Sequence, residues 1–389
     1  MFLFKLKKII KLLLNPFLII VEFLFCITFF FIAIVNFLIP KNYKKIKFAK
    51  NIFIFSKGGF GHQVWVSDIV RYLKLKDSLV INLLDLFRHN EYLSYCFDNK
   101  FIDLNTTLNF SNKYFNVRFG EKEGGYFYFI HSFLIFVLRN ILKKKVICNE
   151  EIYKLLYKLH LEKNIHLKYD LNLYRGILDY QNAYYYCLNQ KKLKVPNLKE
   201  EFRKKFNFLS KFSEKKICTL YLRNRYSNDI ASTFRNSGSM EDYELLIKYL
   251  ENKNYLIVLI GEANQFTENF NQFSQSVIDY KKFKIKKRLF DLYFSLNNDL
   301  FICESGGAHN LAYYSKCAIG INFYPYGYRP VNFKNVVYKK FFKDGVKIEK
   351  NILERDYINF YDLNKIKKEN ILIENNNKNE ILSSIVNFI

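Results

Sequence analysis

The chain has 389 residues, enough for two domains that each bury a core. Its formal net charge of +25 comes mostly from lysines spread evenly along the chain beside Asn, Ile, Phe and Tyr, so we expect no nucleic-acid partner. The seven cysteines form no C-x-x-C motif and no Cys/His cluster, so we expect neither a zinc site nor a disulfide framework. They are residues 26, 96, 148, 187, 218, 303 and 317.

The first predicted element is an apolar segment at residues 17 to 39, bounded by Pro16 and Pro40 and containing one charged residue, Glu22. Its 23 residues are long enough to span a bilayer. No small-residue cleavage site follows, so we interpret it as an uncleaved membrane anchor. Lysines flank both ends and leave its orientation open. A shallow helix lying in the membrane interface, with the lysines on anionic headgroups, is the alternative.

A glycine-rich turn follows the next predicted strand, in "NIFIFSKGGFGHQ" at 51 to 63. A strand that enters a helix through such a turn brings backbone amides and the helix dipole to one point, which suits an anion. A dinucleotide fingerprint fits Gly59 and Gly61, and Asp85 lies at the distance of a ribose-binding acid, but Val64 replaces the third glycine. A tight turn without a ligand is the other alternative.

The turn does not fit the phosphate loop of NTPases, because that loop needs Gly-Lys-Ser/Thr and the corresponding residues are Gly61, His62 and Gln63. The predicted helix at 62 to 75 and the strand in "SLVINLLD" complete a β-α-β unit. The aromatic run at 126 to 142 predicts buried core or an interfacial surface. A polar stretch at 188 to 206 is the predicted domain boundary.

The second half repeats the alternation of strands and helices. Strands are predicted in "KICTLYLRNR", "YLIVLIG", "DLFICES" and "CAIGINFYP", and helices at 239 to 252, with Ser239 as N-cap, at 287 to 296 and at 307 to 315. Alternation of this kind implies parallel sheets, so two such halves predict an α/β protein with two Rossmann-like domains facing a cleft.

A second glycine turn, "CESGGAHN" at 303 to 310, follows the predicted strand "DLFICES". Gly306 and Gly307 let a diphosphate approach the backbone, and Ser305 can cap the helix or bond a phosphate oxygen. His309 can add a charge-assisted contact. A hydrolase elbow, G-x-S-x-G, is excluded because Cys303 stands where its first glycine belongs.

These motifs carry a resemblance to known enzymes. "ESGGAH" followed by "NLAYYSKCAIGINFYP" resembles the nucleotide-sugar loop of GT-B glycosyltransferases, especially the heptosyltransferases. "YLRNR", "FRNSGSMEDYELLIKYLENKNYLIVLIGE" and "ESGGAHNLA" together resemble a family of uncharacterised bacterial glycosyltransferases, with a distant similarity to fucosyltransferases. The resemblance is best over 215 to 330 and reaches back to "SKGGFGH"; residues 90 to 210 resemble no family.

The resemblance implies a role for each matching residue. Arg223 takes the place of the arginine that grips the donor diphosphate, because a guanidinium fork matches phosphate oxygens. Glu304 stands where heptosyltransferases carry aspartate, which leaves its role open between ribose, sugar and structure. The full predicted donor set is Arg223, Arg225, Arg235, Glu304, Ser305, Gly306, Gly307 and His309, and the acceptor-side turn is Gly58, Gly59 and Gly61 with His62.

The chemistry expected is transfer of a sugar from a nucleoside diphosphate to a hydroxyl group, which needs a base for the acceptor and stabilisation of the leaving diphosphate. His62 is the first candidate base and Asp68 the second. No metal and no cofactor are expected, because GT-B enzymes use basic side chains and a helix N-terminus, and "SND" at 227 to 229 is not a D-x-D motif.

The resulting expectation is a membrane-anchored glycosyltransferase of the bacterial inner membrane, facing the cytoplasm. It would transfer sugar to an envelope glycan or a lipid-linked acceptor. The expected domains are an anchor and basic linker at 1–47, an acceptor domain at 48–200 and a nucleotide-sugar domain at 201–389. The alternatives are an NAD(P)-dependent reductase and a non-catalytic nucleotide-sugar-binding membrane protein.

Overall fold

The computed structural model describes 31, 34–35, 37–55, 64, 67–68, 70–71, 77–82, 92–93, 100–103, 133–148, 151, 195–224, 234–324, 326, 333–357 and 363–389. Contacts within the chain divide it into two compact units. Unit 1 comprises Met1–Gly59, Leu73–His89 and Asn99–Lys154, and unit 2 comprises Phe60–Tyr72, Asn90–Asp98 and Leu155–Ile389. The predicted boundary at 188 to 206 stays a prediction.

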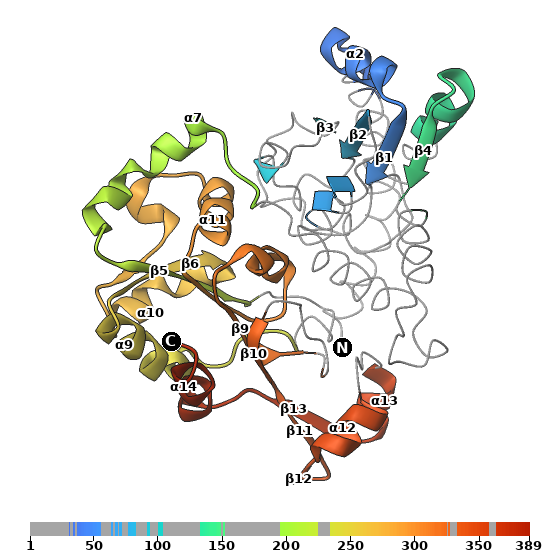
Figure 1. Cartoon of the computed structure of the whole chain (residues 1–389). Coiled ribbons are helices and arrows are strands. Elements are labelled where there is room, and N and C mark those ends of the chain that lie inside the picture. Colours follow the sequence, from blue (N-terminus) through green and yellow to red (C-terminus); the bar gives the residue numbers. More distant parts are fainter. Residues whose placement is uncertain are drawn as a thin grey trace, which may run out of the picture. The chain divides into compact units, whose positions relative to one another are not determined.

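Unit 1 contains a parallel four-stranded sheet in the order β3-β2-β1-β4, visible in Figure 1. The strands are β1 (Asn51–Phe55), β2 (Ser78–Asn82), β3 (Lys100–Asp103) and β4 (Lys145–Cys148). Two helical elements pack on its core, α2 (Pro40–Phe48) and a helix from residue 133 that ends in the π-helical turn η2 (Val137–Ile141). The sequence predicts β1 and β2 and misses β3 and β4.

Unit 2 is built on a six-stranded sheet in the order β10-β9-β8-β5-β6-β7, with every neighbouring pair parallel. Numbered along the chain from β5, these strands run 6-5-4-1-2-3, the Rossmann order read from the other edge. They are β5 (Lys216–Leu222), β6 (Tyr255–Gly261), β7 (Val277–Ile278), β8 (Leu300–Cys303), β9 (Ala318–Phe323) and β10 (Phe333–Tyr338). The predicted α/β class with parallel sheets is confirmed.

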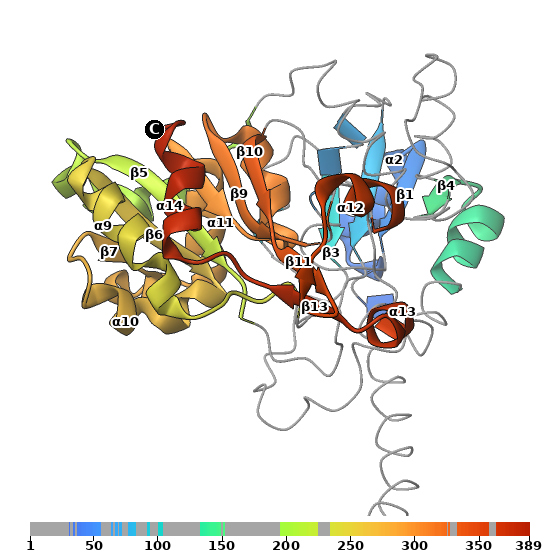
Figure 2. The same cartoon turned by 90° about the horizontal axis from the view of Figure 1, so that it is seen from below.

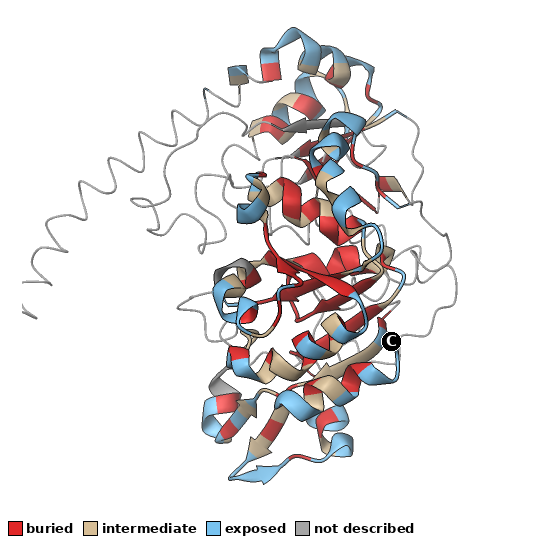
Figure 3. Ribbon diagram, turned by 90° about the vertical axis from the view of Figure 1, so that its left-hand side faces the viewer, coloured by how far each residue is buried: buried red, intermediate tan, exposed pale blue. Residues whose placement is uncertain are grey.

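Both faces of this sheet are covered, which explains why its central strands read as continuous apolar runs. On one face Leu220 packs with residues of α9 (Glu244–Asn252) and α14 (Lys378–Val386). On the other, the Thr219 hydroxyl donates to the carbonyl of Phe294 in α11 (Lys287–Leu296) at 2.8 Å. Figure 3 shows the buried sheet between helices that are exposed on their outer sides.

The remaining elements of unit 2 include two helices that precede β5, short helical turns between strands, and a small antiparallel sheet in the order β12-β11-β13, whose strands are labelled in Figure 1. Figure 2 shows β11 and β13 of this sheet from below, and buried apolar side chains around it form a separate core cluster. Their bounds are α7 (Glu200–Arg203), η3 (Lys204–Phe212), η4 (Met240–Tyr243), η5 (Glu262–Phe266), α10 (Thr267–Asn271), η6 (Tyr280–Phe283), η7 (Gly307–Tyr314), β11 (Lys340–Lys343), β12 (Val346–Lys347), α12 (Lys350–Asp356), α13 (Leu363–Lys368) and β13 (Ile371–Glu374).

Helix predictions in unit 2 are close to the structure. The predicted helix at 287 to 296 is α11. The predicted helix at 239 to 252 begins after Ser239, as a 3-10 turn that continues into α9, but the Ser239 side chain makes no capping bond. The predicted helix at 307 to 315 is the 3-10 helix η7.

The predicted membrane anchor falls largely on residues 17 to 30, outside the described residues. Within the described part of the chain, no helix combines the length and the apolar character that crossing a bilayer requires. The anchor therefore stays a prediction.

Candidate functional site

The strand order of unit 2 reverses between β5 and β8. In open α/β sheets ligands bind beyond the carboxyl ends of the strands at such a reversal, because the connections leave it in opposite directions and open a crevice. Arg223 follows β5 directly, and Glu304 follows β8 directly. The register pairs Tyr221 of β5 with Cys303 of β8, so these two positions lie side by side at the same sheet edge.

Glu304 is completely buried and joins the chain segments around this edge. Its carboxylate accepts hydrogen bonds from the backbone N–H of Arg223 at 2.8 Å, the hydroxyl of Tyr243 at 2.6 Å and the hydroxyl of Ser237 at 2.5 Å. Each carboxylate oxygen accepts at least one hydrogen bond from the protein, and the residue has no exposed surface. Of the roles that the sequence leaves open for Glu304, the structure favours the structural one: it fixes the backbone at Arg223.

A buried lysine accompanies Glu304. Lys339 follows β10, is 5% exposed and donates from Nζ to the carbonyl of Asn236 at 2.6 Å. Burial lowers the pKa of Lys339 to about 8, and the charge of Glu304 opposes that shift. Burial raises the pKa of the Glu304 carboxyl, and Lys339 is the largest influence that lowers it. The two groups therefore support one another's charge, and neither Lys339 nor Ser237 was singled out in the sequence.

The network continues behind Glu304 into β9. Asn322 donates to the Tyr243 hydroxyl at 3.1 Å, and its side-chain oxygen accepts from the backbone N–H of Asn376 at 2.8 Å. Asn322 has a left-handed φ of 49° inside a strand, a conformation that Asn adopts more readily than most residues. The register of β9 and β10 shifts at this bulge, and the bulge turns the amide toward Tyr243.

His309 lies in the first turn of η7 and is neutral in this environment. Its Nδ1 accepts a hydrogen bond from the backbone N–H of Gly306 at 3.0 Å, which leaves the ring proton on Nε2 as a donor. Burial, with smaller contributions from the charges of Arg235 and Arg223, lowers the pKa of His309 to about 3. A neutral imidazole can donate one hydrogen bond from Nε2, and the expected contact of His309 with a diphosphate stays a prediction.

His309→Gln is expected to remove a pH dependence of stability on the acid side. The pKa of His309 in the folded protein, about 3, lies below the ordinary value of 6.5. Between these two pH values the unfolded chain therefore binds more protons than the folded protein. As the pH falls from 6.5 to 3, His309 thus lowers the free energy of unfolding. The difference in unfolding free energy between the wild type and His309→Gln should shift steadily over that range. Denaturation at stepped pH measures it, and a constant difference would contradict a buried neutral imidazole.

Ser305 and Gly306 have contacts that the sequence did not indicate. The Ser305 hydroxyl accepts from the backbone N–H of Tyr324 at 3.4 Å, and the residue that caps η7 is Gly306. A Cβ on Gly306 would lie 2.3 Å from the hydroxyl of Tyr221, and one on Gly261 would lie 2.5 Å from the same ring. The Tyr221 ring therefore fills the space between two glycines at the ends of β6 and β8. Gly306 is needed for this packing, whether or not a diphosphate also approaches it.

Gly306→Ala is expected to lower the unfolding free energy by about 1–3 kcal/mol, because the added methyl group collides with the Tyr221 ring. Tyr221→Ala removes the obstacle, so the double variant should lose less stability than the sum of the single changes. Chemical denaturation of the four proteins gives the coupling. Strict additivity would show that Tyr221 is not what excludes a side chain at 306.

Asp68, the second candidate base, is completely buried within unit 2. Its carboxylate accepts a hydrogen bond from the hydroxyl of Tyr314 in η7 and pairs with Arg71 at 3.2 Å. Arg71 also donates to the Tyr314 hydroxyl at 3.2 Å. These contacts attach the helical turn around Asp68 to the helix that carries His309. A positioning role fits this enclosed carboxylate better than proton abstraction, and its catalytic role stays untested.

Several predicted residues lie outside the described part of the chain. They are Gly58, Gly59, Gly61, His62, Asp85 and Arg225. Arg235 and Gly307 are described and partly buried. The structure thus brings together Arg223, Arg235 and the segment Glu304–His309 and is silent on the acceptor-side turn. Among the described residues, no three His, Cys, Asp or Glu side chains gather as a metal site would require.

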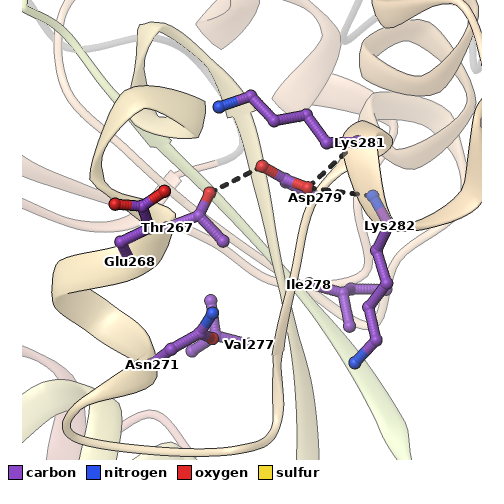
Figure 4. Close-up of a pocket in the computed structure, with 8 residues that line it drawn as sticks. All are labelled: Thr267, Glu268, Asn271, Val277, Ile278, Asp279, Lys281 and Lys282. Atoms are coloured by element: carbon purple, nitrogen blue, oxygen red, sulfur yellow. Dashed lines mark hydrogen bonds between the residues drawn. The ribbon is translucent and has the colours of Figure 1, made fainter.

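A separate cavity of about 280 Å³ lies beside α10 and the edge strand β7 (Figure 4). Asp279 in its wall accepts hydrogen bonds from the Thr267 hydroxyl at 2.7 Å and from the backbone N–H groups of Lys281 and Lys282. That carboxylate caps η6 and is engaged by protein donors. The cavity contains none of the predicted site residues and lies two strands from β5, so it is not the candidate site.

Comparison with known proteins gives two structural similarities. The chain is similar to Escherichia coli ADP-heptose LPS heptosyltransferase II, with a TM-score of 0.42 and 15% identity over 75% of this chain and 90% of that one. It is also similar to the E. coli heptosyltransferase WaaC with ADP-2-deoxy-2-fluoro heptose, with a TM-score of 0.40 and 10% identity over 78% and 98% of the two chains. No protein-family model and no curated protein sequence matches the chain.

Both similar structures are heptosyltransferases, the group that the segment 303 to 310 is expected to resemble. With identities below 25% and TM-scores below 0.5, the similarity carries no information on the substrate or the reaction.

Proposed function

We propose that the protein is a glycosyltransferase of the GT-B type that takes its sugar from a nucleoside-diphosphate donor. The observation that supports this most is the meeting of Arg223 with the segment Glu304–His309 at the strand-order reversal of a Rossmann sheet. A diphosphate carries several negative charges, and this edge offers arginine charge, the N-terminus of η7 and a neutral imidazole N–H.

In this proposal the diphosphate is the leaving group. Cleavage of the bond between the sugar and the diphosphate leaves negative charge on a phosphate oxygen, and fixed guanidinium groups stabilise that charge without reorganising. Glu304 accepts a hydrogen bond from the backbone N–H of Arg223, so the backbone that carries the guanidinium group is fixed at this sheet edge. A metal ion is not required for this step. His62 is the proposed base for the acceptor hydroxyl, and Asp68 is proposed to hold η7 in place through Tyr314.

The acceptor class and the location are further parts of the proposal, and the N-terminal sequence supports a membrane location without fixing the orientation of the anchor. The apolar segment at 17 to 39 is proposed to hold the enzyme on the bacterial inner membrane with its site on the cytoplasmic side. An enzyme held there acts readily on a lipid-linked or envelope-glycan acceptor. The alternative reductase needs Gly59, Gly61 and Asp85 to bind NAD(P), and no observation among the described residues favours it.

A ligand panel tests the proposal. The full chain in detergent is heated in the presence of ADP, GDP, UDP, CDP, NAD and NADP, each at the same concentration. One nucleoside diphosphate should raise the unfolding temperature, since a ligand that binds only the native state stabilises it. Stabilisation by NAD(P) with no response to any nucleoside diphosphate would contradict the proposal. Transfer of the sugar from the matching donor to an acceptor then distinguishes an enzyme from a binding protein.

A further inference from the structure

Exposed apolar side chains are concentrated in unit 1. Of the thirteen large hydrophobic side chains that are exposed among the described residues, eight belong to residues 31–48 and 136–141. Single exposed apolar residues are ordinary, but a concentration of them marks an interaction surface. The eight are Phe31, Val35, Leu38, Ile39, Tyr43, Phe48, Phe136 and Ile141, with exposures from 40% to 64%.

The two segments that carry these side chains pack against one another. Phe37 and Ile46 share one apolar core with Leu134 and Leu138. The Nζ of Lys144 donates to the carbonyl of Lys47 at 2.6 Å, which joins the end of α2 to the turn after η2. We call the exposed side chains of residues 31–50 and 136–145 the α2 surface.

The α2 surface is also strongly basic. Residues 31 to 50 contain five lysines and residues 133 to 148 contain Arg139 and three more lysines, and neither segment contains an Asp or Glu. Carboxylates from elsewhere reach two of these groups: Asp77 lies 3.7 Å from Lys50, and Glu151 lies 2.8 Å from Arg139. Exposed lysines at 41, 44, 47, 143 and 145 accompany the apolar side chains.

We propose that the α2 surface binds the surface of an anionic lipid bilayer. Apolar side chains would enter the boundary between headgroups and acyl chains while lysines contact lipid phosphates, the combination that interfacial helices use. The apolar run at 17 to 39 leads directly into α2 at Pro40, so the α2 surface includes the last residues of that run and continues past the point where the chain would leave the membrane. A second copy of the chain fits poorly, because a two-fold contact would place the same lysines against each other.

This inference does not depend on the glycosyltransferase proposal, and its test uses no donor. The chain has a single tryptophan, Trp65, which allows a clean fluorescence probe. In a Trp65→Phe background of the full chain, Phe48→Trp and Phe136→Trp place one probe on each segment. Tyr43→Trp is a second α2 probe if Phe48→Trp does not fold. Leu372→Trp, 56% exposed in β13 of unit 2, is the matched control.

Each variant is reconstituted in vesicles of phosphatidylglycerol with brominated acyl chains, which quench only a tryptophan that reaches the bilayer. The probes at 48 and 136 should be quenched and blue-shifted, and the control at 372 should not. In phosphatidylcholine, in about 0.5 M NaCl, or with Lys41→Gln and Lys44→Gln added, the quenching should fall, since each lysine near an anionic surface contributes about fivefold in binding.

Two outcomes would overturn the proposal. Probes at 48 and 136 that stay in water while the chain remains bound to the vesicles would show that the N-terminal segment alone holds it there. Probes that are shielded equally without any lipid, together with a dimeric mass in sedimentation, would show that a second copy covers the α2 surface.

Discussion

Arg223→Ala is expected to weaken binding of the nucleoside diphosphate by 10- to 100-fold. Arg223 is 8% exposed and stands at the sheet edge where the donor diphosphate is proposed to lie. A hydrogen bond between a buried charge and a phosphate contributes roughly 1.5–3 kcal/mol, or about 13- to 160-fold in affinity, which overlaps that range. Titration calorimetry with the diphosphate that stabilises the wild type measures the change directly.

Two further variants make this result interpretable. Arg223→Lys keeps the charge but loses the planar fork, so it should recover only part of the affinity. Arg203→Ala removes an exposed arginine in α7 and should leave affinity unchanged. A folded Arg223→Ala protein that binds the diphosphate as tightly as the wild type would remove Arg223 from the site.

Glu304→Ala is expected to lower the unfolding free energy by about 3–5 kcal/mol, because it leaves the buried Lys339 without its opposing charge. It also deprives Arg223 N–H and the hydroxyls of Ser237 and Tyr243 of their acceptor. Glu304→Gln keeps the shape and one acceptor and should cost less. Chemical denaturation followed by circular dichroism gives both values.

The control for Glu304 is Glu201→Ala in α7, where the side chain is exposed and the change should stay within about 0.5 kcal/mol. Removing Lys339 as well should restore part of the loss, since the double variant has no unpaired buried charge. A Glu304→Ala protein as stable as the control would mean that the carboxylate does not hold the segments together, and a ligand role for it would return.

Much of the fold can be predicted from the sequence because the local apolar patterns of unit 2 agree with the strands and helices that form there. The runs that form β5, β6, β8 and β9 are apolar over whole strands, as buried parallel strands require, and α11 has a helical apolar period from end to end. β7 has two residues and β3 four, too short for any period to emerge. The antiparallel sheet after β10 carries exposed lysines and mixed patterning, and the sequence did not predict it.

The site could be predicted only in part, since its supporting residues are distant in the sequence. Arg223 and the glycine turn at 306 follow strands that can be read directly. Tyr243, by contrast, bonds Glu304, and the charge of Lys339 acts on it, only because β5, β8 and β10 lie in one sheet. In the sequence, Tyr221 looks like any other apolar residue of a buried strand. Its packing between Gly261 and Gly306 is indicated locally only by those two glycines, which lie at the end of β6 and just after β8, the two neighbouring strands.

Hydrogen exchange of the full chain, with and without the stabilising nucleoside diphosphate, tests the central claim most directly. Peptide mass spectrometry reports backbone protection segment by segment. Slower exchange is expected at 221 to 224, at 234 to 237 and at 303 to 310, with no change at 267 to 282 around the separate cavity and with loss of the protection in Arg223→Ala. Protection confined to 267 to 282, or to the α2 surface, would place the nucleotide elsewhere and contradict the proposed donor site.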